Sequence, residues 1–238
     1  MAAGQVFPQN YGEFVRALLK AGFSTGSGNP HGVFSLIPFT WEEQPYIVDS
    51  PVRWHTEDPE TDPWEWRMRV LYERQDIAYA KLFHRASGFI TKEWYPDFIS
   101  LRRGGNSFEE AWEEGSVTHA MKRIYDAVLR LGPVLSPVLK REAGFGREES
   151  TLFEQALTDL QMRMFLTICG QGKRKNKFGE EYGWYCSKFC TVEQFWGEDF
   201  IRQALVIDPE DAEARLTAQA LRLNPDAGKQ AIRRFLFG

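Results

Sequence analysis

The stretch from Ser107 to Phe189 constrains the fold more than any other part of this 238-residue chain. Ser107 and Glu110 form a capping-box pattern, which predicts a short helix at about Phe108 to Glu114. A longer helix is expected from about Val117, and Gly132-Pro133 would end it. Its apolar positions recur at helical spacing and predict one buried face, made of Ala120, Ile124, Ala127, Val128 and Leu131.

Two further helices and two strands follow. Ser136-Pro137 opens the short helix VLKREA, and a third helix is expected from about Arg147. The apolar stripe of this third helix consists of Phe153, Ala156, Leu157 and Leu160. The segment MFLTIC is typical of a strand, GQGKRKNKFGEEYG of a glycine-bounded turn, and WYCSKF of a return strand. Three helices, a strand, a basic loop and a return strand is the order of a winged helix-turn-helix domain.

The flanking segments predict an α+β protein with three parts. A first module, residues 1–106, contains a helix ending at Gly22, the apolar run VFSLI as a strand, a helix starting at Asp62-Pro63, and the strands AYAKLF and SGFIT. We leave open whether this small α/β module is itself wing-like. Gly104-Gly105 separates it from the winged-helix domain, residues 107–200. The pairs Asp208-Pro209 and Asn224-Pro225 predict N-caps of two helices in a C-terminal tail, residues 201–238.

Charge and composition exclude several classes of protein. With 29 Lys and Arg against 33 Asp and Glu, the formal net charge is −4, so the whole surface is not that of a nucleic-acid-binding protein. A local basic patch remains compatible with this balance. Apolar runs stay below the roughly 18 residues that a membrane helix needs, and the start MAAGQVFPQNYGEF lacks a signal-peptide pattern. We therefore expect a cytoplasmic protein without a membrane partner.

The cysteines and histidines do not predict a metal or cofactor site. Cys169, Cys186 and Cys190 include no Cys-x-x-Cys pair, and the four histidines show no paired ligand spacing. We expect reduced thiols, no metal and no cofactor. Hydrolase, phosphate-loop and dinucleotide motifs are also missing from the sequence, so the catalytic residues are unknown.

The turn between the two expected strands is the main candidate for binding. Lys173, Arg174, Lys175 and Lys177 place four positive charges within five residues. A basic loop of this kind suits contacts to phosphate, which provide affinity without reading the base sequence. Three more cations on the second helix and at the start of the third would extend the patch: Lys140, Arg141 and Arg147. The alternative is a solvated hairpin tip that lysines keep soluble.

The expected third helix is acidic, with Glu148, Glu149, Glu154 and Asp159. Carboxylates facing a major groove repel phosphates, although Gln155 and Thr158 could reach bases. We therefore expect the basic loop, rather than this helix, to lead any contact with DNA. The alternative is that this helix packs on a partner or on a second copy of the chain.

One tryptophan pair is also informative. Trp64 and Trp66 lie two residues apart in DPWEWRMR and therefore on different sides of a helix, so one is expected in the core and the other exposed.

Several phrases of the chain are similar to those of a known family. They are WEWR (Trp64 to Arg67), YAKLF, GFITKEWYPDF, EEG (Glu113 to Gly115), ALTDLQ and GWYCSKF. Over roughly Phe14 to Phe200, the chain resembles the AlkZ-related family, small bacterial relatives of the AlkZ/YcaQ winged-helix DNA glycosylases. The resemblance implies a winged-helix fold and contact with DNA in repair.

The larger glycosylases carry a catalytic Gln-x-Gln motif, and this chain has none, since Gln161 is followed by Met162-Arg163. No catalytic residue is carried over from the family. The expected function is DNA binding linked to repair. One alternative is an active glycosylase that uses other residues, and a second is a protein-interaction or homodimerisation scaffold built on a winged helix.

Overall fold

Two compact units make up the chain. The computed structural model describes residues 7–29, 31–46 and 50–238. The N-terminal segment in which we found no signal-peptide pattern therefore lies partly, at residues 1–6, outside the described residues. Unit 1 comprises Met1–Tyr95 and Ala214–Gly238, and unit 2 comprises Pro96–Glu213. Both units combine helices with antiparallel strands, which confirms the expected mixture of helices and strands. The domain boundaries expected after residues 106 and 200 stay predictions, and both positions fall inside unit 2.

Unit 1 contains a three-stranded antiparallel arrangement with β3 in the centre. β3 (Ala86–Thr91) pairs with β1 (Phe23–Thr25) and with β2 (Ile77–Phe83). β2 and β3 form the hairpin that AYAKLF and SGFIT predict. The remaining elements before β2 are α1 (Tyr11–Ala21), a 3-10 helix (Gln44–Tyr46) and α2 (Pro63–Glu73).

Helix α2 begins as its sequence predicts. The Asp62 carboxylate accepts a hydrogen bond of 2.8 Å from the backbone N–H of Trp64, and Pro63 occupies the first helical position, where its missing N–H costs nothing. Trp66 is fully buried and stacks on Phe14 with ring centroids 5.1 Å apart. Trp64 is exposed, with the Arg67 guanidinium 3.2 Å from its ring centroid. One tryptophan therefore lies in the core and the other at the surface, as expected.

The strand expected at Val33 to Ile37 is wrong, because this segment has no strand pairing. Two of its hydrogen bonds instead involve side chains of β1: the backbone N–H of Leu36 donates to the Ser24 hydroxyl at 2.9 Å, and the Thr25 hydroxyl donates to the Phe34 carbonyl at 3.3 Å. Val33, Phe34 and Ile37 are nevertheless buried. Apolar composition thus predicted burial correctly, whereas side-chain hydrogen bonds replace the ladder of a strand.

The C-terminal helices are α10 (Pro209–Leu223) and α11 (Lys229–Phe237). Asp208 caps α10 as expected, since its carboxylate accepts the backbone N–H of Glu210 at 2.8 Å. The N-cap expected at Asn224 is wrong, because Asn224 follows the last turn of α10 and its amide donates to the carbonyls of Gly32 and Val33, at 2.8 and 3.0 Å. Asn224 therefore anchors a loop of unit 1 and does not start a helix.

Unit 2 begins within α3 (Tyr95–Arg103) and continues to the first residues of α10. Between them lie α4 (Phe108–Glu113), α5 (His119–Leu131), β4 (Val134–Leu135), α6 (Ser136–Glu142), α7 (Ser150–Met162), β5 (Leu166–Lys175), β6 (Glu181–Thr191), α8 (Val192–Trp196) and α9 (Glu198–Leu205). The capping box of Ser107 and Glu110 is present at the start of α4. Each segment expected to be a helix or strand between Ser107 and Phe189 has that type. The turn expected from Gly170 to Gly183 is too long, because β5 continues to Lys175 and β6 already begins at Glu181.

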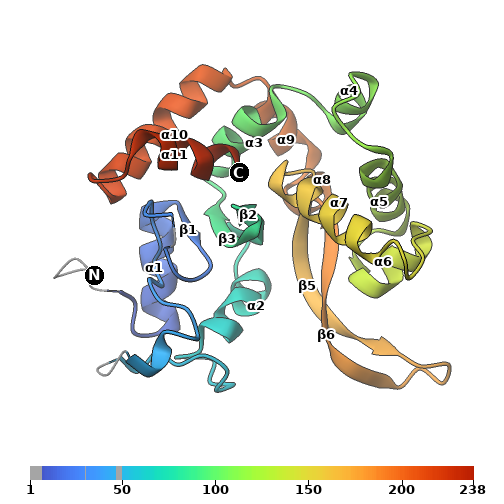
Figure 1. The fold of residues 1–238 in the computed structure, drawn as a ribbon, viewed down its shortest axis with the longest axis horizontal. Helices are drawn as coiled ribbons and strands as arrows, with labels where there is room; N and C mark the ends of the chain where they lie inside the picture. Colours follow the sequence, from blue (N-terminus) through green and yellow to red (C-terminus); the bar gives the residue numbers. More distant parts are fainter. Residues whose placement is uncertain (1–6, 30, 47–49) are drawn as a thin grey trace. The chain divides into compact units, whose positions relative to one another are not determined.

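The strands of unit 2 repeat the pairing order of unit 1. β6 pairs antiparallel with β5 and with the short β4, so the second strand of the hairpin is central, as β3 is in unit 1. Figure 1 shows β5 and β6 as a long hairpin whose end lies away from α5, α6 and α7.

The apolar stripes of α5 and α7 form much of the core of unit 2. Phe153, Ala156, Leu157 and Leu160 of α7 are all buried. On α5 the expected face is buried except for Leu131, which is exposed because the helix ends there and Gly132 turns the chain with φ of 71°. Within residues 7–29, 31–46 and 50–238, no helix has both the length and the apolar character needed to cross a membrane.

Candidate nucleic-acid interface

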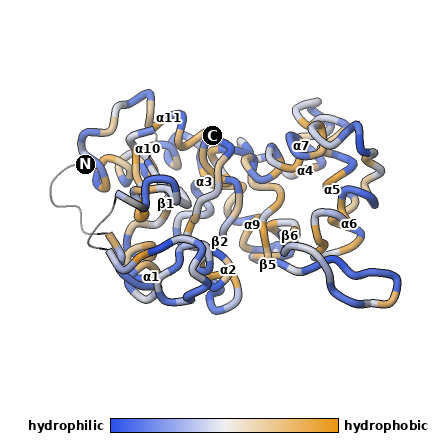
Figure 2. The backbone as a smooth tube through the Cα atoms, turned by 60° about the horizontal axis from the view of Figure 1, so that its bottom comes forward, coloured by the Kyte–Doolittle hydropathy of each residue, from blue (hydrophilic) through white to orange (hydrophobic). Residues whose placement is uncertain are grey.

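The β5–β6 hairpin passes from a buried base to an exposed end. Leu166, Thr167 and Ile168 at the start of β5 are buried, as are Phe189 to Thr191 on β6. From Arg174 to Tyr185 every residue is exposed. In Figure 2 this distal part is coloured mostly as hydrophilic. The base therefore fixes the hairpin in unit 2, while its distal part is accessible to a partner.

Asn176 organises the turn at the tip of the hairpin. Its side-chain oxygen accepts the backbone N–H groups of Phe178 and Glu180 at 2.8 and 3.1 Å, and its amide donates to the Glu180 carboxylate at 2.8 Å. Gly179 supplies the left-handed conformation of the turn, with φ of 84°. The tip is thus a defined turn rather than an arbitrary loop.

A bulge interrupts the distal part of the hairpin. Gly172 pairs with Cys186 and Arg174 pairs with Tyr182, so Lys173 alone lies opposite the three residues Gly183–Tyr185. Gly183 accommodates this mismatch with φ of 75°, a conformation that other residues adopt only with strain. Bulges bend a strand and re-aim its side chains. Trp184 lies in the middle of this bulge.

The four cations predicted as the binding patch all lie on this hairpin. Lys173 is half-buried, and Arg174, Lys175 and Lys177 are exposed. The ammonium groups of Lys173 and Lys177 each lie 4.9 Å from a ring centroid, that of Tyr185 and that of Phe178 respectively. The structure therefore brings these four residues together on one element.

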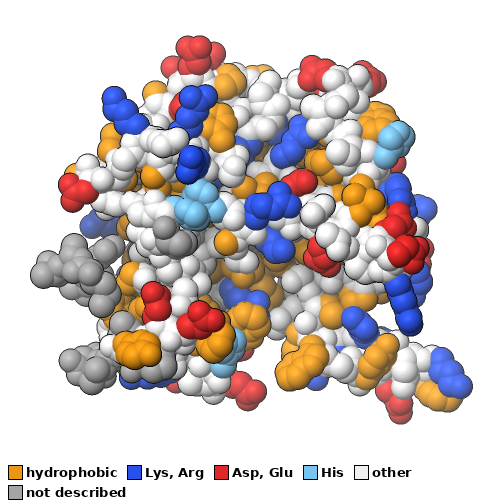
Figure 3. Space-filling model, viewed as in Figure 1, with side chains coloured by type: hydrophobic (Ala, Val, Ile, Leu, Met, Phe, Trp, Pro, Cys, Tyr) orange, Lys and Arg blue, Asp and Glu red, His pale blue; other side chains and the backbone are white. Residues whose placement is uncertain are grey.

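Four exposed aromatic side chains of the hairpin were missed by the sequence analysis. The exposed fractions are 93% for Trp184, 75% for Phe178, 60% for Tyr185 and 50% for Tyr182. The signal was the run YGWY, of which we assigned Tyr182 and Gly183 to the turn and Trp184 and Tyr185 to the return strand. Figure 3 shows hydrophobic side chains beside Lys and Arg on the hairpin, at the lower right.

The three supporting cations lie on α6 and in the turn before α7. The Lys140 ammonium donates to the Ser150 hydroxyl at 2.5 Å, and Arg141 pairs with its neighbour Glu142 at 2.9 Å. Arg147 is exposed in the turn that leads into α7. An exposed pair such as Arg141–Glu142 contributes little energy, so it leaves Arg141 able to contact a phosphate.

The acidic residues of α7 and its preceding turn differ in their contacts and in their exposure. Glu149 accepts the backbone N–H of Gly146 at 3.0 Å and pairs with Arg123 at 3.3 Å, and these contacts lower the pKa of its carboxyl group. Glu148 and Glu154 are exposed. Of the two residues proposed to reach bases, Gln155 is exposed and Thr158 is buried. The expectation for Thr158 is therefore wrong, because this position faces the core of unit 2.

Cys169 and Cys190 lie near the base of the hairpin, whereas Cys186 lies further along β6, opposite Gly172. The Cys190 thiol donates to Cys169, which lowers the pKa of Cys169 and raises that of Cys190. Among the residues that the structure describes, no group of three or more His, Cys, Asp or Glu side chains is arranged to hold a metal ion.

Gln161 has a structural role. Its side chain is buried, and its amide donates to the Leu157 carbonyl at 2.9 Å within α7. This amide is therefore engaged within its own helix.

Comparison with protein families gives one match. A family model described as AlkZ related matches residues 8–237, which is nearly the whole chain. Comparisons with curated proteins and with solved structures give no significant match.

Proposed function

The chain belongs to the AlkZ-related family, and we propose that it is a DNA-binding protein related to DNA-repair glycosylases that contacts DNA through its β5–β6 hairpin. The observation that carries this proposal is the hairpin itself, an exposed and ordered element with four cations. Lys and Arg side chains on such an element can contact successive phosphates of the backbone.

We assign the hairpin to a winged-helix domain at residues 107–200. The support is the order α5, β4, α6, α7, β5, β6, with β6 central between β4 and β5. In helix-turn-helix domains the last helix of the motif enters the major groove, and here that helix is α7. The same strand order in unit 1 supports a wing-like assignment for the preceding module, and the helices of residues 201–238 follow the domain.

The charges favour the hairpin over α7 as the main contact. Glu148, in the turn before α7, and Glu154, within α7, are exposed and would repel phosphates. Lys140, Arg141 and Arg147 extend the basic surface by three cations next to this helix. The proposed contact is therefore mainly to the DNA backbone, with little reading of the base sequence. DNA is accessible in the bacterial cytoplasm, so this proposal agrees with the location and origin expected from the sequence.

The test is the salt dependence of duplex binding, measured by fluorescence anisotropy from about 20 to 200 mM salt. The variant replaces Lys173, Arg174, Lys175 and Lys177 by Gln. The logarithm of the binding constant should depend less steeply on salt, by about 0.9 per lost phosphate contact. An unchanged slope, or failure of the wild type to bind at low salt, would overturn the proposal.

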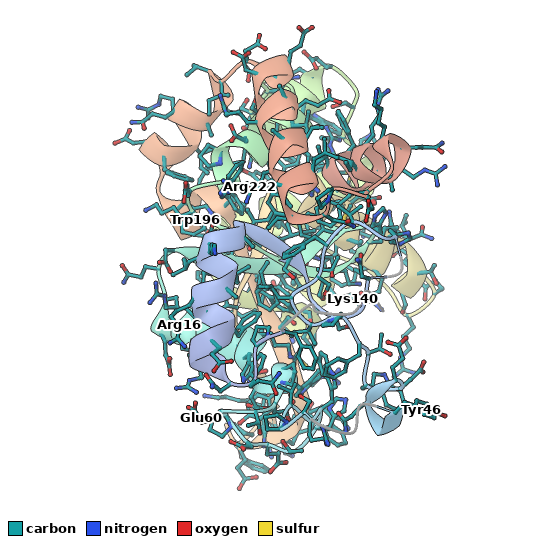
Figure 4. The ribbon with its side chains drawn as sticks, turned by 90° about the vertical axis from the view of Figure 1, so that its left-hand side faces the viewer. Arg16, Tyr46, Glu60, Lys140, Trp196 and Arg222 are labelled. Carbon is teal, nitrogen blue, oxygen red and sulfur yellow. The ribbon has the colours of Figure 1, made fainter. Side chains whose placement is uncertain are left out.

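A matched control removes four exposed cations from unit 1, namely Arg16, Lys20, Arg222 and Lys229. Figure 4 labels Arg16 and Arg222 on their helices. The control has the same net charge as the hairpin variant, so a general charge effect would alter both slopes equally. If the hairpin itself contacts DNA, the salt slope should change in the hairpin variant and not in the control.

Two further measurements separate the remaining alternatives. Release of a modified base from lesion-bearing duplex would show that the protein is also a glycosylase. Absence of DNA binding, together with a solution mass of twice 27.5 kDa, would indicate a dimerisation scaffold instead.

A further inference from the structure

Four aromatic rings are exposed within eight residues of the hairpin, from Phe178 to Tyr185. A single exposed aromatic residue is ordinary on a protein surface, but a cluster usually marks an interaction site. Trp184 is almost entirely exposed at 93%, so it contributes little to the core. These rings are therefore candidates for contact with a partner rather than for packing.

The backbone around Trp184 is shaped to present it. Three residues of β6 lie opposite the single residue Lys173, and Gly183 turns the strand with φ of 75°. No atom lies within 4 Å of the place where a Cβ atom at position 183 would stand. The glycine is therefore needed for its backbone conformation and not because space is short. The bulge thus places Trp184 and Tyr185 outside the regular ladder.

Two of the four rings lie beside cations of the hairpin. Lys173 lies 4.9 Å from the ring of Tyr185 and Lys177 lies 4.9 Å from the ring of Phe178. Alternating cations and exposed rings are typical of surfaces for unpaired nucleic acid, where the cations contact the backbone and the rings stack on base faces. In an intact duplex those faces are covered by neighbouring base pairs. Cations alone would suffice for binding paired DNA.

We propose that the hairpin binds DNA containing unpaired bases in preference to fully paired DNA, with Phe178, Tyr182, Trp184 and Tyr185 stacking on the exposed base faces. This inference rests on the proposed binding of DNA by the same hairpin. It adds the class of substrate: a duplex interrupted by a bubble, a gap or a mismatch. Trp184 makes the largest stacking contribution because it has the greatest exposed ring area.

The experiment compares two labelled DNA molecules by anisotropy at one salt concentration: a perfect duplex, and the same duplex with a short central bubble. The wild type should bind the bubble more tightly. Trp184→Ala should weaken bubble binding by about 5- to 150-fold, the loss expected for one stacked base, and leave duplex binding nearly unchanged. Trp184→Phe should restore most of the bubble affinity, because a phenyl ring also stacks.

Trp41→Ala is the matched control, since Trp41 is also an exposed tryptophan but lies in unit 1. It should change neither affinity. Equal losses on bubble and duplex, or no loss on either, with Trp184→Ala would overturn the stacking proposal. A dimer in solution that Trp184→Ala converts to a monomer without changing the bubble preference would overturn it too, because the ring would then bind a second copy.

These outcomes separate this inference from the function on which it rests. If the four-cation variant flattens the salt dependence and Trp184→Ala has no effect, DNA binding stands and the preference for unpaired bases fails. If the wild type binds neither DNA, the proposed function fails as well.

Discussion

Arg103 shows how a single residue holds parts of unit 2 together. Its side chain is fully buried at the end of α3 and pairs with Glu193 on α8 at 2.9 Å. Its guanidinium also donates to the Met164 carbonyl and lies 4.5 Å from the ring centroid of Phe165. A buried cation is tolerated only where charge and hydrogen-bond partners compensate its lost hydration. In the sequence, Arg103 is notable only as the residue before the Gly104-Gly105 boundary.

Removal of Arg103 should strongly destabilise the protein. Arg103→Ala removes the fully buried partner of an ion pair with the half-buried Glu193, and we expect a loss of about 3 kcal/mol in the free energy of unfolding, measured by chemical denaturation. Arg202→Ala is the control, because Arg202 pairs with Asp199 at 2.8 Å where both side chains are exposed. That change should cost less than about 1 kcal/mol. Similar losses for the two variants would contradict the structural role of Arg103.

At the scale of elements, the turn between α6 and α7 depends on an ionised carboxylate. Glu149, the residue before α7, accepts a hydrogen bond from the backbone N–H of Gly146 and pairs with Arg123. The Arg123 guanidinium also donates to the carbonyl of Ala143 at 3.0 Å. The first of these contacts is the largest cause of the lowered pKa of Glu149. The charged form is therefore the one that the folded turn favours.

Acid should weaken this turn. The pKa of Glu149 in the folded protein lies below the ordinary value of about 4.3. The contribution of this carboxylate to the free energy of unfolding is therefore present above that pH and is lost as the pH falls through the pKa in the folded protein. Glu149→Gln should thus lower the midpoint of thermal unfolding at pH 7, and the difference from wild type should shrink below about pH 4. Glu154→Gln, at an exposed position of α7, is the charge control. Identical pH profiles for the two variants would refute this assignment.

The hairpin illustrates how far an element can be predicted. Its glycine-bounded basic segment and flanking patterns predicted two strands joined by a turn, but Lys173, Arg174 and Lys175 lie on β5 and not in the turn. The exposure of Trp184 and Tyr185 was not predictable in the same way, because an aromatic run has the same local pattern in a buried strand as in an exposed one. Only the bulge opposite Lys173 and the position of the hairpin end distinguish the two cases.

At the scale of the whole molecule, the chain returns to unit 1 at its C-terminal end. Phe235 of α11 is buried and stacks on Phe83 of β2, with ring centroids 4.1 Å apart. The Gln219 amide of α10 donates to the Ala21 carbonyl at 2.6 Å, across 198 positions of sequence. The C-terminal residues thus complete the core of a unit that starts with the N-terminal half.

Loss of the Phe235 ring should therefore destabilise unit 1. Phe235→Ala should cost about 3 to 5 kcal/mol, the usual range for a buried phenylalanine, and should lower the midpoint of thermal unfolding. Phe237→Ala, two residues away at an exposed position, should have little effect. Equal destabilisation by both changes would mean that the packing of Phe235 on Phe83 is not what stabilises the unit.

The sequence by itself determined most of the local elements of this protein, although not the conformation of Val33 to Ile37. Helix caps such as Asp62 and Ser107 act within three residues, and apolar periodicity acts within one element, so both can be read without knowing the fold. Only the tertiary structure decided which rings are exposed, that Arg103 is buried beside Glu193, and that Asn224 anchors a loop instead of starting a helix. Burial and hydrogen bonding at these positions depend on segments distant in sequence, and no local pattern contains that information.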